Sequence, residues 1–297
     1  MIKKSIGWHI FNAFNILFMI AFCVMILYPY VNVLAIALND NNATTGGGLM
    51  LLPRKFTFMN FKALLSDSGI LRSAAITVGR ILLGVPYSVG IAFFAAYALT
   101  KKYLPGRRAI IFILLIPNYI SGGLIPTYIL YSKIHLLNNP LVYILPTGFA
   151  FFSFILLRTY MYTIPDSLEE SAKLDGAGDY RVMFKIFFPL CTPIIATLVL
   201  FAAVSHWNDW VTTLYFITNS KWNTLAYELR RILSEQERMS RLVQHAIQSG
   251  QVPRASPGTS AGVRNAQIII TTLPIILLYP FCQKYFIQGM LIGGVKE

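Results

Sequence analysis

Residues 164–189 read IPDSLEESAKLDGAGDYRVMFKIFFP, a charged stretch that separates two long apolar runs. Two adjacent glutamates stand near its start, where a helix dipole favours negative charge. Ser167 and Glu170 have the spacing of a capping box. Gly176 can end that helix in a left-handed conformation, and Asp179 can cap a second helix. The stretch therefore predicts two short, exposed helices joined by a turn.

The apolar runs on either side belong to a chain that is poor in charge. Hydrophobic residues make up 56% of the 297 residues and charged residues 12%, whereas soluble domains carry about a quarter charged residues. Apolar runs of about 18 residues or more are typical of membrane spans. We predict an all-α polytopic membrane protein with six spans. These spans are Phe11–Ala37, Ser73–Leu99, Ala109–Tyr131, Pro140–Met161, Leu190–Thr218 and Ala266–Gln288.

The first span also has features of a secretory signal. Lys3 and Lys4 precede it, and Ala35–Ala37 resembles a small-residue cleavage site. The apolar run Phe11–Ala37 is, however, 27 residues long, and the apolar core of a signal peptide has about 7–15. We therefore predict an uncleaved first span.

Proline and glycine interrupt several spans. Pro86 lies in the second, and Pro117 with Gly122 and Gly123 lies in the third. Such breaks are tolerated in a membrane where neighbouring helices satisfy the freed backbone groups. We expect the third span to be the most irregular.

Lysine and arginine in the short links predict the orientation, because cytoplasmic links carry the excess of positive charge. With six spans, both termini and the two most basic short links lie on the cytoplasmic side of the inner membrane. The residues concerned are Lys3, Lys4, Lys101, Lys102, Arg107, Arg108, Arg158, Lys173, Arg181, Lys185, Lys284 and Lys296. The opposite side is basic too, mainly in segment 219–265, so the charge rule is weaker here than usual.

The chain divides at these spans into a short terminus, a first span with its outer segment, a core domain and a tail. The regions are the cytoplasmic N-terminus 1–10, the first span and outer segment 11–72, the core transmembrane domain 73–288 with a charged loop at 162–189 and an outer loop at 219–265, and the cytoplasmic tail 289–297.

The outer loop contains a predicted helix. Thr224–Gln251 has apolar residues at roughly helical spacing with polar residues between them. Gln251–Gly262, rich in proline, serine and glycine, is predicted to be a loop. The helix is either a docking surface or a helix that lies across the outer ends of the spans.

Several kinds of chemistry are absent from the sequence. Cys23, Cys191 and Cys282 all lie in apolar runs, which argues against a disulfide framework and a metal site. The glycines at 46–48 are followed by Leu-Met-Leu and not by the Lys and hydroxyl residue of a phosphate-binding loop. We therefore expect no enzymatic activity in this chain.

The loop 164–189 resembles the signature loop of membrane subunits in binding-protein-dependent, ATP-driven (ABC) importers. That signature reads Glu-Ala-Ala, three residues, Gly, nine residues, Ile-x-Leu-Pro. Here Glu170-Ser171-Ala172 precedes Gly176 and Ile186–Pro189 at the same spacing. In the family this helix docks into a groove of the ATPase subunit, so the resemblance implies a cytoplasmic coupling helix between the fourth and fifth spans. The implied coupling residues are Glu169, Glu170, Ser171, Ala172, Asp175 and Gly176.

Other stretches resemble the sugar permeases of this family. Ala96–Leu99 with Pro105–Arg108 resembles the end of their second span, Pro53–Leu65 their first outer segment, and Pro274–Lys296 their tail. The chain is similar over nearly its whole length to this group, and in particular to the smaller maltose-importer permease. Ser121–Thr127 is similar to a subgroup that serves complex oligosaccharides, including pectin or alginate fragments.

The resemblance implies an assembly. This chain would pair with a second permease, two ATPase subunits and an extracytoplasmic solute-binding protein, within the lipid bilayer. ATP and Mg would bind the partner ATPase, and this chain would carry no cofactor and bind no nucleic acid. Rival interpretations are an ABC permease for another class of solute, a stand-alone secondary carrier, and a receptor or scaffold without transport.

Five residues are candidates for the substrate path: Arg80, Asn118, Trp207, Asn208 and Asp209. A charge inside a span is costly and indicates function by default, although Arg80 could instead reach water at the span end and Asp209 could pair with an Arg. Aromatic and amide groups suit sugar rings, although tryptophans also form interface belts. The formal charge is +13, and about half of the lysines and arginines lie on the predicted outer side, which favours an acidic oligosaccharide. The alternatives are attraction to an acidic binding protein and no role in substrate binding.

Overall fold

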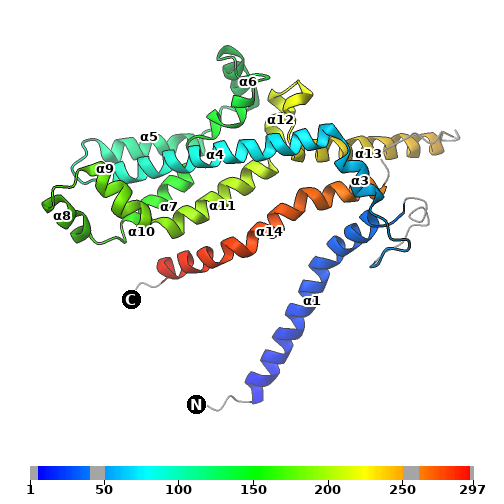
Figure 1. The fold of residues 1–297 in the computed structure, drawn as a ribbon, viewed down its shortest axis with the longest axis horizontal. Coiled ribbons are helices and arrows are strands. Elements are labelled where there is room, and N and C mark those ends of the chain that lie inside the picture. Colours follow the sequence, from blue (N-terminus) through cyan, green and yellow to red (C-terminus); the bar gives the residue numbers. More distant parts are fainter. Residues whose placement is uncertain (1–5, 41–50, 250–260, 295–297) are drawn as a thin grey trace. The chain divides into compact units, whose positions relative to one another are not determined.

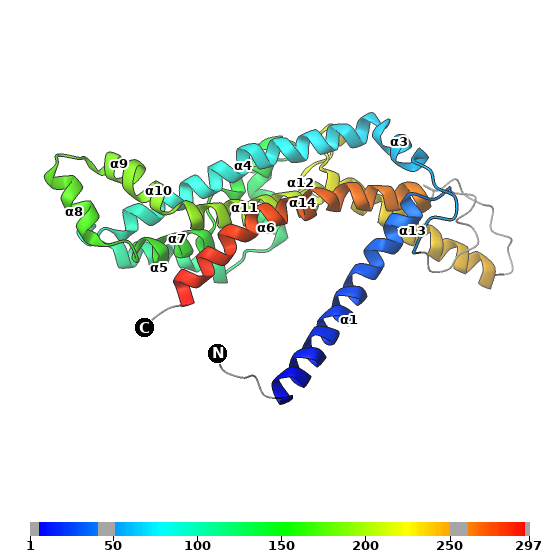
Figure 2. The ribbon, with the colours of Figure 1, turned by 60° about the horizontal axis from the view of Figure 1, so that its bottom comes forward.

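A computed structural model of the protein describes residues 6–40, 51–249 and 261–294, with side chains as far as residue 277 except at a few positions within 236–247. The described residues form helices joined by turns (Figures 1 and 2). One isolated antiparallel bridge joins Asn39 and Phe56. The predicted all-α class is confirmed. The chain forms two compact units, residues 1–70 with 229–273 and residues 71–228 with 274–297.

The first unit begins with α1 (Ile6–Ala37), a helix of 32 residues that contains the first predicted span. Its length exceeds the ~20 residues that a hydrocarbon core requires. Most of its apolar side chains are exposed, among them Leu17 and Met25. An apolar surface of this extent is unfavourable in water and is stable when lipid or another apolar chain covers it.

Two buried asparagines hold the turn after α1. The side-chain amide of Asn60 donates to the carbonyl oxygens of Ala37 and Asn39, each at 2.9 Å. The backbone N–H of Lys55 donates to the side-chain oxygen of Asn39 at 2.8 Å. These bonds fix α3 (Met59–Leu65), and with it the outer segment, to the end of α1.

The second unit is built on α4 (Ser68–Thr100), a helix of 33 residues that contains the second predicted span. The predicted break at Pro86 is wrong, since α4 continues through it. Proline removes one backbone hydrogen bond, and the bonds before and after it carry the helix on.

The other spans of this unit are bent helix pairs. The α5 helix (Arg107–Tyr119) meets α6 (Leu124–Lys133) at 113°, and Gly123 between them has φ +84°. The short helices η1 (Pro140–Tyr143) and η2 (Leu145–Thr147) meet α7 (Phe151–Met161) at 41°. The third predicted span is therefore the most sharply bent of the three, as expected from its proline and glycines.

The fifth predicted span is not one helix. The segment Asp179–Leu190, which comprises α9 (Asp179–Val182), η3 (Met183–Phe187) and α10 (Phe188–Leu190), meets α11 (Thr192–Asn208) at 77°. The predicted Leu190–Thr218 is corrected by a second break after Asn208, where Asp209 is extended and α12 (Val211–Phe216) begins two residues later. Side-chain bonds to Asp209, described below, stabilise this break.

The number of spans stays a prediction. Two described helices are long and apolar enough to cross a membrane, and the number rises to five if each bent pair counts as one span. The sixth predicted span lies within α14 (Ala261–Gly294), and the side chains of its second half lie outside the described residues. In the outer loop, α13 (Leu225–Gln248) confirms the predicted helix, η4 (Ser220–Trp222) precedes it, and the predicted loop lies largely outside the described residues.

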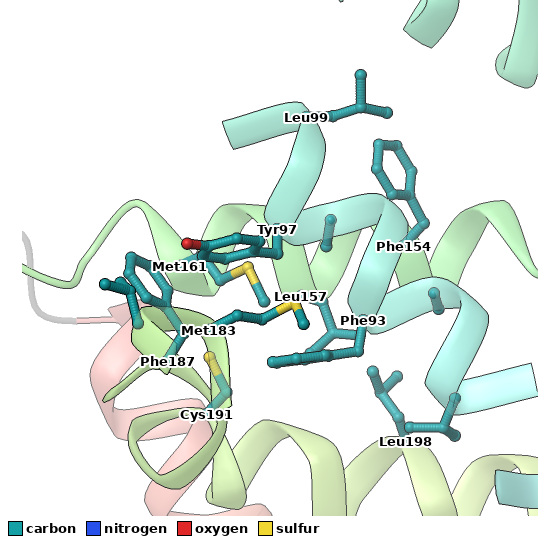
Figure 3. Close-up of a cluster of buried hydrophobic side chains, with 14 of the residues drawn as sticks. Phe93, Tyr97, Leu99, Phe154, Leu157, Met161, Met183, Phe187, Cys191 and Leu198 are labelled. Atoms are coloured by element: carbon teal, nitrogen blue, oxygen red, sulfur yellow. The ribbon is translucent and has the colours of Figure 1, made fainter. Parts of the chain in front are cut away.

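The apolar core of the second unit lies where α4, α7 and the segment α9–α11 meet. Figure 3 shows Phe93 and Tyr97 of α4 beside Leu157 of α7, with Phe187 opposite. The rings of Tyr97 and Phe187 lie 5.1 Å apart, edge to face. This packing holds the charged loop at one end of the unit, where Figures 1 and 2 both show α8 (Asp166–Leu174).

Candidate functional site

The charged loop folds into α8, an exposed helix of nine residues. The predicted capping box is wrong. The helix begins at Asp166 after Pro165, which places Ser167 inside the first turn, and no side chain caps it. Proline has the backbone angle that a helix start requires and lacks the N–H that would go unpaired there. Gly178, not Asp179, precedes α9.

The end of α8 confirms the prediction for Gly176. This glycine has φ +79°. Its N–H donates to the carbonyl of Lys173 at 3.0 Å, and the N–H of Ala177 donates to the carbonyl of Ala172 at 2.9 Å. This bonding pattern is a Schellman motif, which satisfies the last carbonyls of a helix through a left-handed residue. The turn therefore has a defined shape.

The two adjacent glutamates of α8 face different surroundings. Glu169 is part-buried and accepts from Nζ of Lys101 at 2.6 Å and from Nζ of Lys173 at 2.9 Å. Lys101 lies in the link that follows α4, and its Nζ also lies 4.0 Å from the centre of the Tyr97 ring. Glu170 is exposed. One glutamate thus joins α8 to the helix bundle, and its neighbour faces outward.

Charge pairing sets the protonation of this network. Burial alone would raise the pKa of Glu169, but hydrogen bonds from Lys101 and Lys173 outweigh it and hold that pKa below its ordinary value. The hydrogen bond to Glu169 in turn raises the pKa of Lys173. Both groups therefore stay charged across the neutral range.

The outer face of α8 combines charge with exposed apolar surface. Ser171, Asp175 and Gly176 are exposed with Glu170, whereas Ala172 is half-buried and packs toward the core. Leu174 is 89% exposed, with Leu168 and Tyr180 also on the surface. Sequence reasoning did not select Leu174 or Lys101. The apolar spacing gave no reason to expect a bare leucine, and no local pattern joins Lys101 to the loop.

Deeper in the unit, the structure brings Arg80 and Asp209 together across 129 positions. Arg80 donates from Nη2 to the Asp209 carboxylate at 2.8 Å and from Nη1 to the Asp209 carbonyl at 3.2 Å. Asp209 also accepts from the N–H of Thr212 at 3.1 Å. Arg80 therefore neutralises the carboxylate and satisfies a carbonyl that the break between α11 and α12 leaves open.

A polar network continues from this pair. The Arg80 guanidinium lies 4.6 Å from the centre of the Tyr143 ring and Nη2 lies 3.3 Å from Nδ1 of His206. The Tyr143 hydroxyl donates to the carbonyl of Trp222 at 2.7 Å and lies 2.9 Å from the hydroxyl of Thr213. The network holds α4, η1, α11 and α12 together around one buried cation.

Comparison with known proteins assigns the family. Residues 88–292 match the model of the family described as "Binding-protein-dependent transport system inner membrane component". The chain belongs to this family. It is therefore an integral membrane protein of the permease type, and permease subunits of this family are not enzymes themselves.

The similarity to individual relatives extends over nearly the whole chain. This permease is 32% identical to the "Polygalacturonan/rhamnogalacturonan transport system permease protein YtcP" of Bacillus subtilis, over 94% of this chain and 96% of that one. It is 33% identical to "Protein LplC" of the same organism, over 97% and 95%. A solved chain titled "Crystal structure of a bacterial ABC transporter involved in the import of the acidic polysaccharide alginate" matches with a TM-score of 0.85 and 27% identity, over 96% of this permease and 100% of that chain.

The remaining predicted path residues have other surroundings than the Arg80–Asp209 pair. Trp207 lines a separate apolar cavity of about 190 Å³ with residues of α4 and α14. Asn208 is exposed at the end of α11, and Asn118 is exposed near the end of α5. The structure thus places two of the five predicted residues in one cluster, and that cluster also includes Tyr143 and His206, which are not among the five.

Proposed function

We propose that this permease is one of two membrane subunits of an ABC importer for acidic oligosaccharides. A second permease would complete the translocation path, and an extracytoplasmic solute-binding protein would deliver the sugar. Two ATPase subunits would bind ATP and Mg in the cytoplasm, so this chain would contribute the path and the lever. Both termini would lie in the cytoplasm and the spans in the inner membrane.

The observation that carries the importer assignment is the surface of α8. A helix that only connects two spans has no need of an 89% exposed leucine beside an exposed glutamate, above a turn of defined shape. Exposed apolar groups with a charged rim are typical of protein docking sites. We infer that Glu170 and Leu174 contact the ATPase subunit while Glu169 transmits the force to α4.

The acidic substrate is supported by the relatives and by charge. Polygalacturonan and alginate, which the names of two similar proteins contain, are polymers of uronic acids. The chain has a formal charge of +13, and about half of its lysines and arginines lie on the predicted outer side. A basic entrance speeds the capture of an anionic solute.

Uptake into proteoliposomes tests the substrate class. The assembled complex with its binding protein would be supplied with uronate oligosaccharides and with neutral oligosaccharides of the same length, and ATP hydrolysis and accumulated sugar would be measured. We expect stimulation by the uronate series. Equal stimulation by both series would overturn the acidic preference, and transport by this chain alone would favour a stand-alone carrier.

Co-purification tests the docking surface. Leu174→Asp and Glu170→Arg are expected to reduce recovery of the ATPase subunit with the tagged permease in mild detergent. Leu52→Asp is the matched control, because Leu52 is a similarly exposed leucine, 79%, in the outer segment. Loss of the ATPase from the Leu52 variant, or full retention in both α8 variants, would contradict the assignment.

A further inference from the structure

A cleft of about 330 Å³ lies beside the Arg80–Asp209 pair. Its walls come from α4, from the start of α7 with the residues just before it, and from one face of α11. All of these belong to the second unit. The volume falls within the range of ~300–1,000 Å³ that is usual for small-molecule sites.

The lining of the cleft alternates aromatic rings with hydroxyl groups. Phe152 of α7 is 58% exposed and Phe201 of α11 is 43% exposed. Ser88, Ser153 and Ser205 contribute hydroxyls from the three walls. A sugar ring presents apolar C–H faces and a rim of hydroxyls, so flat aromatic surfaces next to hydroxyls match its two kinds of surface.

One wall depends on a glycine. A Cβ atom added to Gly84 of α4 would lie 2.8 Å from ring atoms of His206. Because Gly84 has no side chain, α11 can approach α4 closely at this position, which lies one helical turn after Arg80. His206 and Arg80 both line the cleft, so this approach shapes its inner end.

Arg80, which also lines the cleft, is buried and paired. The side chain of Arg80 is 2% exposed, and its Nε has no hydrogen-bond partner among the described residues. Its two terminal nitrogens bind Asp209. With its side chain closed off and its charge paired with Asp209, Arg80 forms a fixed part of the cleft wall.

We propose that this cleft is a subsite for one sugar ring of the transported oligosaccharide. The ring would lie against Phe152 and Phe201, with its hydroxyl rim beside the hydroxyls of Ser153 and Ser205. Asp209 already neutralises Arg80, so the subsite recognises the ring and not a carboxylate. The proposal rests on the proposed function and adds that this permease itself touches the sugar.

Transport kinetics of the assembled complex test the subsite. Phe152→Ala and Ser205→Ala are expected to raise KM for uptake roughly three- to tenfold, the loss typical of one aromatic or hydrogen-bonding contact. The increase should be alike for uronate and neutral oligosaccharides of equal length, wherever both are transported. Phe112→Ala on α5, at an exposed phenylalanine outside the cleft, is the matched control and should leave KM unchanged.

Chemical protection gives a second measurement that does not depend on turnover. Ser205→Cys would be introduced with Cys23→Ser and Cys282→Ser, and its alkylation by a maleimide followed in the assembled complex. Saturating oligosaccharide should slow alkylation at position 205 severalfold and leave that of Ser132→Cys on α6 unchanged. Monosaccharide at high concentration should protect as well, because one ring fills the subsite.

The outcomes distinguish a failure of the proposed subsite from a failure of the proposed function. If the wild-type complex imports oligosaccharide while the cleft variants keep a normal KM and position 205 is not protected, the subsite is wrong and the importer stands. Blocked alkylation without sugar would mean that protein or lipid fills the cleft, which also overturns the subsite. A wild-type complex that imports no sugar would overturn both.

Discussion

The Nζ atom of Lys101 lies 2.6 Å from Oε2 of Glu169, although 68 positions separate the two residues. Lys101 follows the last turn of α4, and Glu169 lies on α8. The pair joins the exposed helix α8 to the 33-residue helix α4. A displacement of α8 is therefore expected to pull directly on α4.

Removal of the Lys101–Glu169 ion pair should lower the stability of the fold and weaken the coupling of α8 to ATP hydrolysis in the complex. We expect Lys101→Ala to lower the free energy of unfolding in detergent by about 1–3 kcal/mol, because Glu169 keeps its partial burial and loses one of its two partners. Stimulated ATP hydrolysis by the complex should fall, and Lys101→Arg should restore part of it.

The neighbouring lysine provides the control. Lys102 bonds Asp166 at 3.0 Å, but both side chains are more than 70% exposed, at 77% and 75%. Exposed pairs contribute little, so Lys102→Ala should change neither thermal unfolding nor coupling. Equal effects of Lys101→Ala and Lys102→Ala would contradict a specific role for the Lys101–Glu169 ion pair.

The loop should loosen in acid and in strong base. The pKa of Glu169 is lowered in the folded protein, so its stabilisation is complete above the ordinary value of about 4.3 and is lost as pH falls through the lower folded value. The pKa of Lys173 is raised, so its stabilisation is complete below about 10.4 and is lost as pH rises through the higher folded value.

Hydrogen exchange of α8 against pH measures this behaviour. Protection should stay constant between about pH 5 and 10 and fall on the acid side. In the Glu169→Gln variant, α8 should be less protected at neutral pH, and its protection should not fall further as the pH is lowered. If the variant loses protection in acid just as the wild type does, a group other than Glu169 causes that loss.

The turn after α8 should tolerate only residues that accept a left-handed backbone. Nothing lies within 4 Å of a Cβ built on Gly176, so the obstacle is its φ of +79° and not lack of space. Gly176→Val should cost about 1–2 kcal/mol and reduce coupling, while Gly176→Asn should be milder.

Gly178 serves as the comparison, because a Cβ there also meets open space and its φ is −73°. Gly178→Ala should keep normal ATPase coupling. A defect as large as that of Gly176→Val would mean that the loop responds to any change and not to backbone conformation.

The close approach of α4 and α11 should be sensitive to a single methyl group. Gly84→Ala would place a carbon 2.8 Å from the His206 ring, and overpacking of this kind typically costs about 1–3 kcal/mol. Gly79 directly precedes Arg80 on the same helix, and a Cβ added there meets nothing within 4 Å, so Gly79→Ala should be neutral. Thermal unfolding in detergent measures both, and a stable Gly84 variant would show that the contact is adaptable.

Much of the architecture could be predicted from local properties of the sequence. The length of apolar runs predicts α1 and α4, because each must satisfy its backbone within lipid. Gly176 predicts a left-handed turn, because backbone conformation depends mainly on the residue itself. Pro117 with Gly122 and Gly123 predicts the bend in the third span for the same reason.

Other features were decided by the tertiary structure. Pro86 leaves α4 unbroken, and the break at Asp209 exists where Arg80 of another helix satisfies its carboxylate and carbonyl. Glu169 and Glu170 are identical in chemistry, yet packing turns one toward Lys101 and leaves the other exposed. These outcomes depend on which groups of distant segments come within hydrogen-bond distance of each other in the folded chain. The order of residues along the chain does not specify those distances.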